Sequence, residues 1–326
     1  MICGKRQSPQ SANSHVKVEK IDPHGFCWGV QSAVDKALRT LAELLPPVYC
    51  LHDLVHNSLV VSELERRGMI FVESTKEVPC GAPVMFSAHG VAPAVRDEAR
   101  ERGLRVIDAT CPFVERSHRR LEDFARRGTP VVIVGHSAHV EVKGLMGEMH
   151  SEECRVISSV EEVASLPFNV EEPVGVVCQT TFSGQEVDDV LSALRERFSL
   201  LETSAASDIC TATRDRQVAV RKFVRSGGDG VLVLGSPSSS NTRRLADIAG
   251  EEGARVLMAE TEGDVAACDF AGIDRLGVTA GASTPEDFFS AAMRLIEERF
   301  DVETASAWNA AGGTPFPACA ARPNDV

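Results

Sequence analysis

A repeated arrangement of cysteines constrains this chain more than any other feature of its sequence. Three of the ten cysteines, Cys27, Cys111 and Cys210, stand where a strand-like or loop segment gives way to a helical run. The helical patterns extend from Ala33 to Leu45, from Pro112 to Arg127, and from just after Cys210 to Arg225. The steps between the cysteines are 84 and 99 residues. Self-similarity over such distances indicates repeated supersecondary units.

Two further elements follow each cysteine at similar distances. A polar residue ends a short segment 28 or 29 residues after each cysteine: His56, His139 and Ser239. Another β-rich run, 62 to 73 residues after each cysteine, leads to His89, Thr180 and Ser283. Alternating strands and helices predict parallel sheets covered by helices. In open parallel sheets, ligands bind beyond the carboxyl ends of the strands.

The predicted fold is therefore α/β, with three quasi-repeated units that each direct one cysteine and several polar residues toward a shared centre. The predicted organisation is a disordered leader (1–16), three α/β domains (17–110, 111–206 and 207–300) and a C-terminal tail (301–326). A simpler interpretation is that α/β domains often end strands in Gly, Ser or His, which would make part of the pattern generic.

Composition narrows the choice of partners and compartment. The 326-residue chain has a formal net charge of −13, which disfavours nucleic-acid binding, and only 5% aromatic residues, which disfavours a base-stacking surface. No apolar run reaches the roughly 18 residues that would span a bilayer. The N-terminal segment lacks the apolar centre of a signal peptide, so we expect a cytoplasmic protein without nucleic-acid or membrane partners.

In a reducing compartment the cysteines are expected to be thiols, metal ligands or nucleophiles. The sequence contains no CxxC, so any metal ligands must come from distant parts of the chain. Three converging thiolates suit an iron–sulfur cluster or a three-cysteine zinc site with one open metal position. A helix N-terminus beside each cysteine is expected to favour the thiolate. The remaining cysteines are interpreted as buried structural thiols or, for Cys3 and Cys319, as residues of the tails.

The other polar residues at the predicted centre suit an anionic ligand. Imidazoles, hydroxyls and an amide could together form a diphosphate cage. The residues are His56, His89, His139, Ser239, Ser240, Asn241 and Ser283. Any one of these histidines could instead be structural. Glu141, two residues beyond His139, could donate a proton at this centre, or it could be a solvated loop residue.

Nine motifs in one order resemble the 4-hydroxy-3-methylbut-2-enyl diphosphate reductase family (LytB/IspH). The resemblance covers about residues 17–300. The motifs are Gly25-Phe-Cys-Trp-Gly-Val30, Val55-His-Asn57, Phe86-Ser-Ala-His-Gly-Val91, Asp108-Ala-Thr-Cys-Pro112, Gly135-His-Ser-Ala-His-Val-Glu-Val142, Gln179-Thr-Thr181, Asp208-Ile-Cys210, Ser239-Ser-Asn241 and Val278-Thr-Ala-Gly-Ala-Ser283.

The resemblance implies a trefoil of three α/β domains around a [4Fe–4S] cluster, which is seen as [3Fe–4S] after loss of the open iron. It implies that Cys27, Cys111 and Cys210 hold three irons and that the fourth iron takes the substrate hydroxyl. The cage residues would bind the diphosphate, Thr180 would orient the hydroxyl and Glu141 would donate the proton. The products would be isopentenyl and dimethylallyl diphosphate, made in the last step of the non-mevalonate pathway. Ferredoxin or flavodoxin would supply the electrons.

The sequence departs from the family pattern at five places, and none of them removes a proposed ligand. Trp28 replaces a small residue, Val140 a proline and Thr211 a tyrosine. Arg214-Asp215 replaces a more neutral pair, and Pro237-Ser238 departs from the usual residues before the serine pair. A divergent paralogue with altered activity is consistent with these changes. Two other classes of protein stay open: a non-catalytic iron–sulfur sensor on the same fold, and a zinc enzyme with a three-cysteine site.

Overall fold

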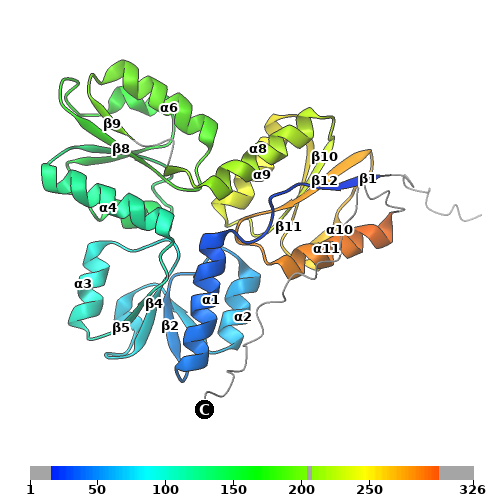
Figure 1. Cartoon of the computed structure of the whole chain (residues 1–326), viewed down its shortest axis with the longest axis horizontal. Coiled ribbons are helices and arrows are strands. Elements are labelled where there is room, and N and C mark those ends of the chain that lie inside the picture. Colours follow the sequence, from blue (N-terminus) through cyan, green and yellow to red (C-terminus); the bar gives the residue numbers. More distant parts are fainter. Residues whose placement is uncertain (1–15, 204–207, 301–326) are drawn as a thin grey trace, which may run out of the picture.

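The computed structural model describes residues 16–203 and 208–300. Cys3, Cys319, the predicted tail and all but the last residue of the predicted leader lie outside the described residues. The described chain forms three α/β lobes that meet near the middle of the molecule (Figure 1). This arrangement confirms the predicted fold class.

Each lobe contains one four-stranded parallel sheet. The first has the order β3 (Met69–Val72), β2 (Val48–Leu51), β4 (Pro83–Phe86) and β5 (Arg105–Asp108). The second has the order β7 (Cys154–Ile157), β6 (Val131–Val134), β8 (Val174–Cys178) and β9 (Leu201–Thr203). The third has the order β11 (Arg255–Ala259), β10 (Gly230–Leu234), β12 (Arg275–Ala280) and β1 (Lys17–Lys20).

The helices alternate with these strands. The first lobe carries α1 (Trp28–Glu43), α2 (Ser58–Arg66) and α3 (Pro93–Glu101), and the second carries α4 (Pro112–Arg127), α5 (Val140–Met146) and α6 (Gly184–Arg197). The third carries α8 (Thr211–Arg225), α9 (Ser240–Glu251), α10 (Glu262–Ala267) and α11 (Glu286–Arg299). Short 3₁₀ turns occupy Thr75–Glu77 and Glu161–Ser165. The predicted helical runs are confirmed, although α1 begins directly after Cys27.

The three sheets share one strand order, which supports the quasi-repeat. In each sheet, the strand that follows the helix capped by a cysteine (β2, β6 or β10) pairs with the next two strands in sequence. A fourth strand pairs with the second of these two. In the third sheet this fourth position is taken by β1, from the start of the described chain, which pairs with β12. This pairing was not predicted from the sequence. The predicted domain boundaries remain a prediction. Lys17–Lys20, which the prediction assigns to the first domain, pairs with the sheet of the third lobe.

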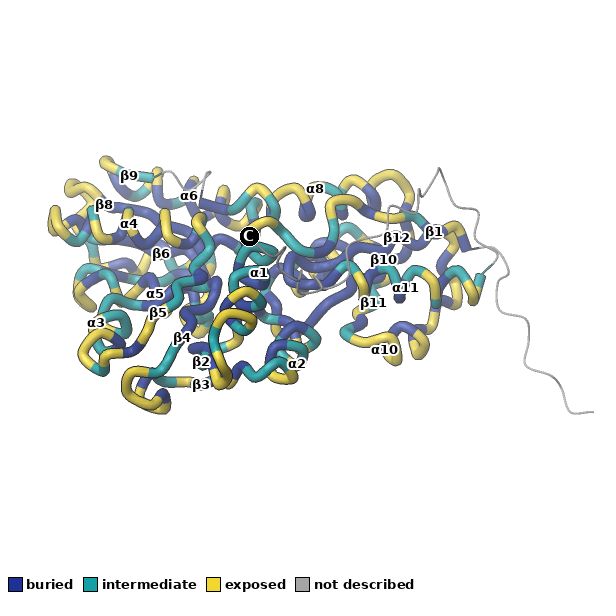
Figure 2. Tube along the Cα trace, turned by 60° about the horizontal axis from the view of Figure 1, so that its bottom comes forward, coloured by how far each residue is buried: buried dark blue, intermediate teal, exposed yellow. Residues whose placement is uncertain are grey.

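Burial follows from the sheet architecture. Strands β6, β8 and β10 read as continuous apolar runs, and all their residues are buried. Such runs are typical of parallel strands that helices cover on both faces. Figure 2 shows this buried interior inside a mostly exposed or half-buried outer layer of helices and loops. Within the described residues, no helix combines the length and the apolar character needed to cross a membrane.

Candidate active site

Each of the three predicted cysteine ligands occupies the N-cap of a helix. Cys27 precedes α1, Cys111 precedes α4 and Cys210 precedes α8. All three have extended backbone conformations, as N-cap residues usually do. The Sγ of Cys27 accepts a hydrogen bond from the Val30 N–H at 3.4 Å, and the Sγ of Cys210 accepts one from the Thr213 N–H at 3.3 Å. The strand-to-helix positions expected from the sequence are therefore present.

Equivalent backbone hydrogen bonds fix all three cysteines. The Cys111 N–H donates to the Ala88 carbonyl at 3.0 Å, and the Cys210 N–H donates to the Thr180 carbonyl at 3.2 Å. The Cys27 N–H donates to the Ala282 carbonyl at 3.0 Å. The three acceptors belong to the segments that follow β4, β8 and β12. Each cysteine is thus tied to the end of a strand in another unit, and the third bond closes the ring between the two ends of the described chain.

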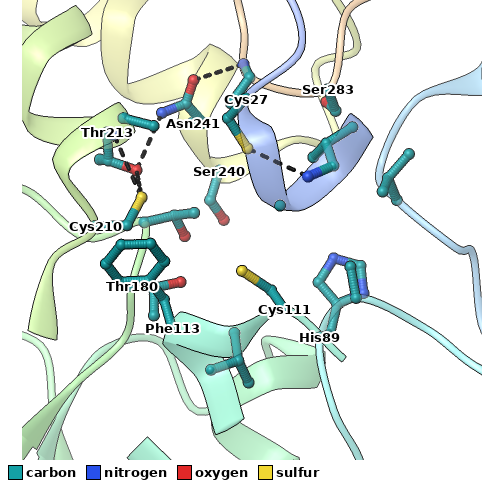
Figure 3. A pocket seen from close by; sticks show the side chains of 18 of the residues that line it. Cys27, His89, Cys111, Phe113, Thr180, Cys210, Thr213, Ser240, Asn241 and Ser283 are labelled. Atoms are coloured by element: carbon teal, nitrogen blue, oxygen red, sulfur yellow. Dashed lines mark hydrogen bonds between the residues drawn. The ribbon is translucent and has the colours of Figure 1, made fainter. Parts of the chain in front are cut away.

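These connections bring every predicted site residue to one cavity. Figure 3 shows part of its lining. Its lining includes all twelve: Cys27, His56, His89, Cys111, His139, Glu141, Thr180, Cys210, Ser239, Ser240, Asn241 and Ser283. The cavity wall is tight at Gly29, where a Cβ atom would lie 2.6 Å from the Cys111 Sγ. A glycine at this position lets the N-terminus of α1 approach the second cysteine. Among residues 16–203 and 208–300, no Lys or Arg contributes to this lining.

Burial opposes ionisation of the cysteines in the protein alone. It raises the pKa of the Cys111 thiol to about 11 and also raises the pKa of Cys210, and in both cases negative charge on the neighbouring cysteine thiols acts in the same direction. Hydrogen bonds from the helix N-termini only partly offset this effect. The helix N-terminus favours the thiolate at both residues, as expected, but burial outweighs it. A bound cation or metal cluster would reverse the balance, since metal binding stabilises the deprotonated thiol.

Three histidines form a compact group in the lining of the cavity. The rings of His56 and His89 are stacked with centroids 4.3 Å apart, and the His139 ring lies edge-on at 5.4 Å and 5.9 Å from them. Burial is the main cause that lowers the pKa of all three imidazoles. Repulsion from the other histidines of the group adds to it at His89 and His139, and the pKa of His139 falls to about 4. At His56, Arg243 and His52 lower the pKa further, and Asp53 opposes them. At neutral pH each ring is therefore neutral and carries one N–H donor.

The backbone fixes the tautomer of His139. Its Nδ1 accepts a hydrogen bond from the Glu141 N–H at 3.2 Å and so caps α5. Because an imidazole nitrogen that accepts cannot carry a proton, the proton of the neutral ring lies on Nε2. His139 is thus prepared as a hydrogen-bond donor at Nε2.

Glu141 and Thr180 form a buried pair between α5 and the end of β8. Glu141 is 1% exposed. Its Oε1 accepts from the Thr180 backbone N–H at 2.7 Å, and its Oε2 accepts from the Thr180 hydroxyl at 2.9 Å. Burial raises the pKa of Glu141 to about 7, even though both hydrogen bonds favour the carboxylate. The alternative that Glu141 is a solvated loop residue is wrong.

Hydroxyl and amide groups complete the site. Asn241 joins three segments, because its Oδ1 accepts from the Ala282 N–H at 2.9 Å and its Nδ2 donates to the Thr213 Oγ1 at 3.5 Å (Figure 3). The Ser283 hydroxyl donates to the His56 carbonyl at 3.0 Å. The Ser240 Oγ, in contrast, is buried and has no hydrogen-bond partner among the described residues. A buried hydroxyl without a partner points to a ligand that supplies one.

Two features of the cavity were not predicted as functional. The Thr213 hydroxyl lies 3.0 Å from the Cys210 Sγ and also contacts Asn241, so it links a cysteine to the polar wall. Thr213 follows the N-cap residue Cys210 by three residues, and this spacing could have indicated the contact between the two side chains. At the rim, Trp28 is 67% exposed directly after Cys27. Three other departures from the family pattern lie at helix starts or in a loop: Thr211 begins α8, Val140 begins α5, and Pro237 precedes α9.

The donor set suits an iron–sulfur group. Three thiols from three units line the same cavity. Thiolates are the ligands that hold such clusters in proteins, with each cysteine bound to a different iron.

The protein thus consists of three α/β units, each with a parallel sheet. Together they direct thiols, imidazoles and one buried acid into a common cavity, which defines an α/β protein with a thiol-lined ligand site. A family model described as LytB protein matches residues 18–297. The chain belongs to this LytB family.

Individual relatives agree with this assignment. A "4-hydroxy-3-methylbut-2-enyl diphosphate reductase 2" of Burkholderia mallei is 40% identical over 291 residues, which cover 89% of each chain. The Stenotrophomonas maltophilia reductase is 43% identical over 81% of this chain and 85% of its own. Among solved structures, the Plasmodium falciparum E-1-hydroxy-2-methyl-but-2-enyl-4-diphosphate reductase is 31% identical, with a TM-score of 0.81 over 87% of this chain and 88% of its own.

Proposed function

We propose that this protein reduces 4-hydroxy-3-methylbut-2-enyl diphosphate to isopentenyl and dimethylallyl diphosphate. The observation that carries the proposal is the convergence of three N-cap cysteines, three neutral histidines and the Glu141–Thr180 pair on one cavity. The LytB family match and the names of the relatives support the same reaction.

The family depends on iron–sulfur chemistry, and we infer that the group here is a [4Fe–4S] cluster held by Cys27, Cys111 and Cys210. When bound, such a cluster with three protein ligands supplies electrons and a Lewis-acidic iron with an open position. The protein contributes the enclosure, the binding of the substrate tail and the protons.

The diphosphate would be held by His56, His89 and His139 together with hydroxyl and amide groups of the third unit. Neutral imidazole N–H groups and hydroxyls donate hydrogen bonds to phosphate oxygens, and such bonds to charged groups are the stronger ones. The Ser240 hydroxyl, which has no hydrogen-bond partner among the described residues, can donate to a phosphate oxygen without breaking a hydrogen bond within the protein. Binding the tail at this wall places the other end of the substrate toward the cysteines.

Glu141 would deliver a proton to the departing hydroxyl. Because the Thr180 N–H requires Oε1 to accept, the proton of the neutral acid lies on Oε2, beside the Thr180 hydroxyl. Thr180 can then orient the substrate hydroxyl or pass the proton onward. The balance of the reaction is two electrons and two protons taken up, one C–O bond broken and one water released.

We infer that a one-electron carrier such as ferredoxin or flavodoxin supplies the electrons near the exposed Trp28.

The proposal is tested by purifying the protein without oxygen and measuring conversion of the hydroxylated diphosphate with reduced flavodoxin. Iron–sulfur absorption with turnover to both isomers is expected. A brown protein that binds the diphosphate without converting it would indicate a sensor on the same fold. A colourless protein that contains stoichiometric zinc would indicate a zinc enzyme.

Substrate binding can be separated from chemistry at Ser240. The Ser240→Ala variant is expected to raise KM, or the Kd for the substrate, by about tenfold or more, because a hydrogen bond to a charged group is worth roughly 1.5–3 kcal/mol. Little structural loss is expected, since this hydroxyl has no hydrogen-bond partner in the described part of the chain. Ser192→Ala on the exposed face of α6 is the matched control. Unchanged affinity in Ser240→Ala, His56→Ala and Asn241→Ala alike would remove the diphosphate cage.

A further inference from the structure

A buried arginine without a carboxylate partner lies beside two of the three cysteines. Arg216, on α8, is 3% exposed, and none of the ion pairs among the described residues includes it. Its guanidinium donates to backbone carbonyls only: to Ala212 at 2.8 Å, to Gly25 at 2.6 Å and to His24 at 3.5 Å. Its Nε is buried and has no hydrogen-bond partner in the described part of the chain.

These carbonyls place the cation between two ligand segments. Ala212 follows Cys210 by two residues and lines the cavity, and Gly25 precedes Cys27 by two residues. Arg216 therefore connects the start of α8 to the loop that leads into α1, across 191 residues of sequence. Burial lowers the pKa of Arg216, and negative charge on Cys27, on Cys210 and on the exposed Asp215 opposes this effect. An arginine side chain nevertheless keeps its charge in a protein.

The surroundings satisfy most of the donors of Arg216 but do not neutralise its charge. Carbonyl oxygens are neutral acceptors, and an isolated buried cation is costly unless an anion accompanies it. Among the residues that line the cavity, those whose negative charge acts on Arg216 are Cys27 and Cys210. Their ionised form is the form that binds iron. The burial of Arg216 is thus explained if both cysteines carry negative charge in the loaded protein.

We propose that Arg216 is the counter-charge of the iron–sulfur cluster and raises its reduction potential. This inference rests on the proposed function. Addition of one electron makes the cluster more negative, so a fixed cation beside two of its ligands stabilises the reduced form more than the oxidised form. Net charge and hydrogen bonding around a cluster are known determinants of its potential. Arg216 acts through the ligand segments and their charge, and it is a positioning residue rather than a catalytic one.

The test is an anaerobic redox titration of the loaded full-length protein, followed by electron paramagnetic resonance. Arg216→Gln removes the charge but keeps an amide donor, and it is expected to shift the one-electron reduction equilibrium toward the oxidised form by at least about tenfold, which corresponds to roughly 59 mV. Arg216→Lys keeps the charge and is expected to retain the wild-type potential. Arg225→Gln is the matched control on the same helix, because Arg225 is exposed and paired with Glu252, and it should leave the potential unchanged.

The outcomes separate charge from simple attachment of the loop. If Arg216→Gln keeps both its cluster and the wild-type potential, the inference is overturned. It is also overturned if Arg216→Gln and Arg216→Lys lose the cluster equally, because attachment to the carbonyls would then be the whole effect. Loss of the cluster in Arg216→Gln alone, with a normal Arg216→Lys, would support the need for charge. A wild-type protein that holds no iron would contradict the proposed function itself.

Discussion

Replacement of Cys111 by serine is expected to abolish turnover and most of the iron–sulfur absorption. Serine is a hard oxygen donor with a high pKa, whereas iron in these clusters prefers soft thiolate ligands. Cys111 has no counterpart that could replace it, since Cys27 and Cys210 approach the cavity from other units and are fixed by their own backbone hydrogen bonds. The measurement is iron and sulfide content, visible absorption and anaerobic activity of the variant beside wild type.

Matched replacements separate ligand loss from loss of a thiol. Cys80→Ser changes an exposed cysteine, and Cys154→Ser changes a buried one in the core beneath the second sheet. Both are expected to keep the wild-type visible spectrum, although Cys154→Ser should lower stability because a hydroxyl replaces a buried thiol. Full cluster content and turnover in Cys111→Ser would contradict the ligand assignment.

The residues of the site could be predicted from the sequence because each belongs to a short motif that recurs in the three units. A cysteine at a strand-to-helix boundary is readable from short motifs, and so are the polar residues that follow each strand. All twelve predicted residues line one cavity for this reason. Three equivalent hydrogen bonds, from the cysteines to Ala88, Thr180 and Ala282, give the repeat a physical basis.

What the sequence could not predict depends on contacts between distant segments. The strand β1 completes the third sheet through pairing with β12, and no local pattern encodes a partner more than 250 residues away. The raised pKa values of Cys111 and Cys210 were missed because desolvation depends on the closed cavity and not on the helix N-terminus alone. The buried position of Arg216 likewise follows from the approach of α8 to the loop before Cys27.

The second large effect is expected at Glu141. Glu141→Gln keeps the size of the side chain and its acceptor for the Thr180 N–H, but an amide cannot protonate a departing hydroxyl. Loss of general acid catalysis typically lowers the rate by about 10²–10⁴-fold. The cluster should assemble normally because no thiol is changed, and the substrate Kd should stay near the wild-type value. Single-turnover kinetics without oxygen, with cluster content quantified in both proteins, measure the effect.

The pH dependence of this step has a definite sign. An acid catalyst must be protonated before it acts, and burial raises the pKa of Glu141 to about 7. The wild-type single-turnover rate is therefore expected to be highest below this pH and to fall as the pH rises through it, approaching a tenfold decrease per pH unit. In Glu141→Gln this inflection should disappear along with most of the rate. An ordinary glutamate would have lost its proton well below neutral pH, so the buried position of Glu141 is what keeps a proton available there.

Three results would assign the proton differently. Near-normal turnover in Glu141→Gln would mean that the proton reaches the hydroxyl by another route, through the Thr180 hydroxyl and water or from the diphosphate of the substrate. An unchanged pH inflection in the variant would show that another group titrates near 7. Slow turnover accompanied by loss of the cluster would indicate that Glu141 supports the architecture between α5 and β8. If Glu141 is the acid, the Glu141→Gln protein must hold its cluster, bind substrate normally, turn over slowly and lack the pH inflection. Each of the three results above lacks at least one of these four properties.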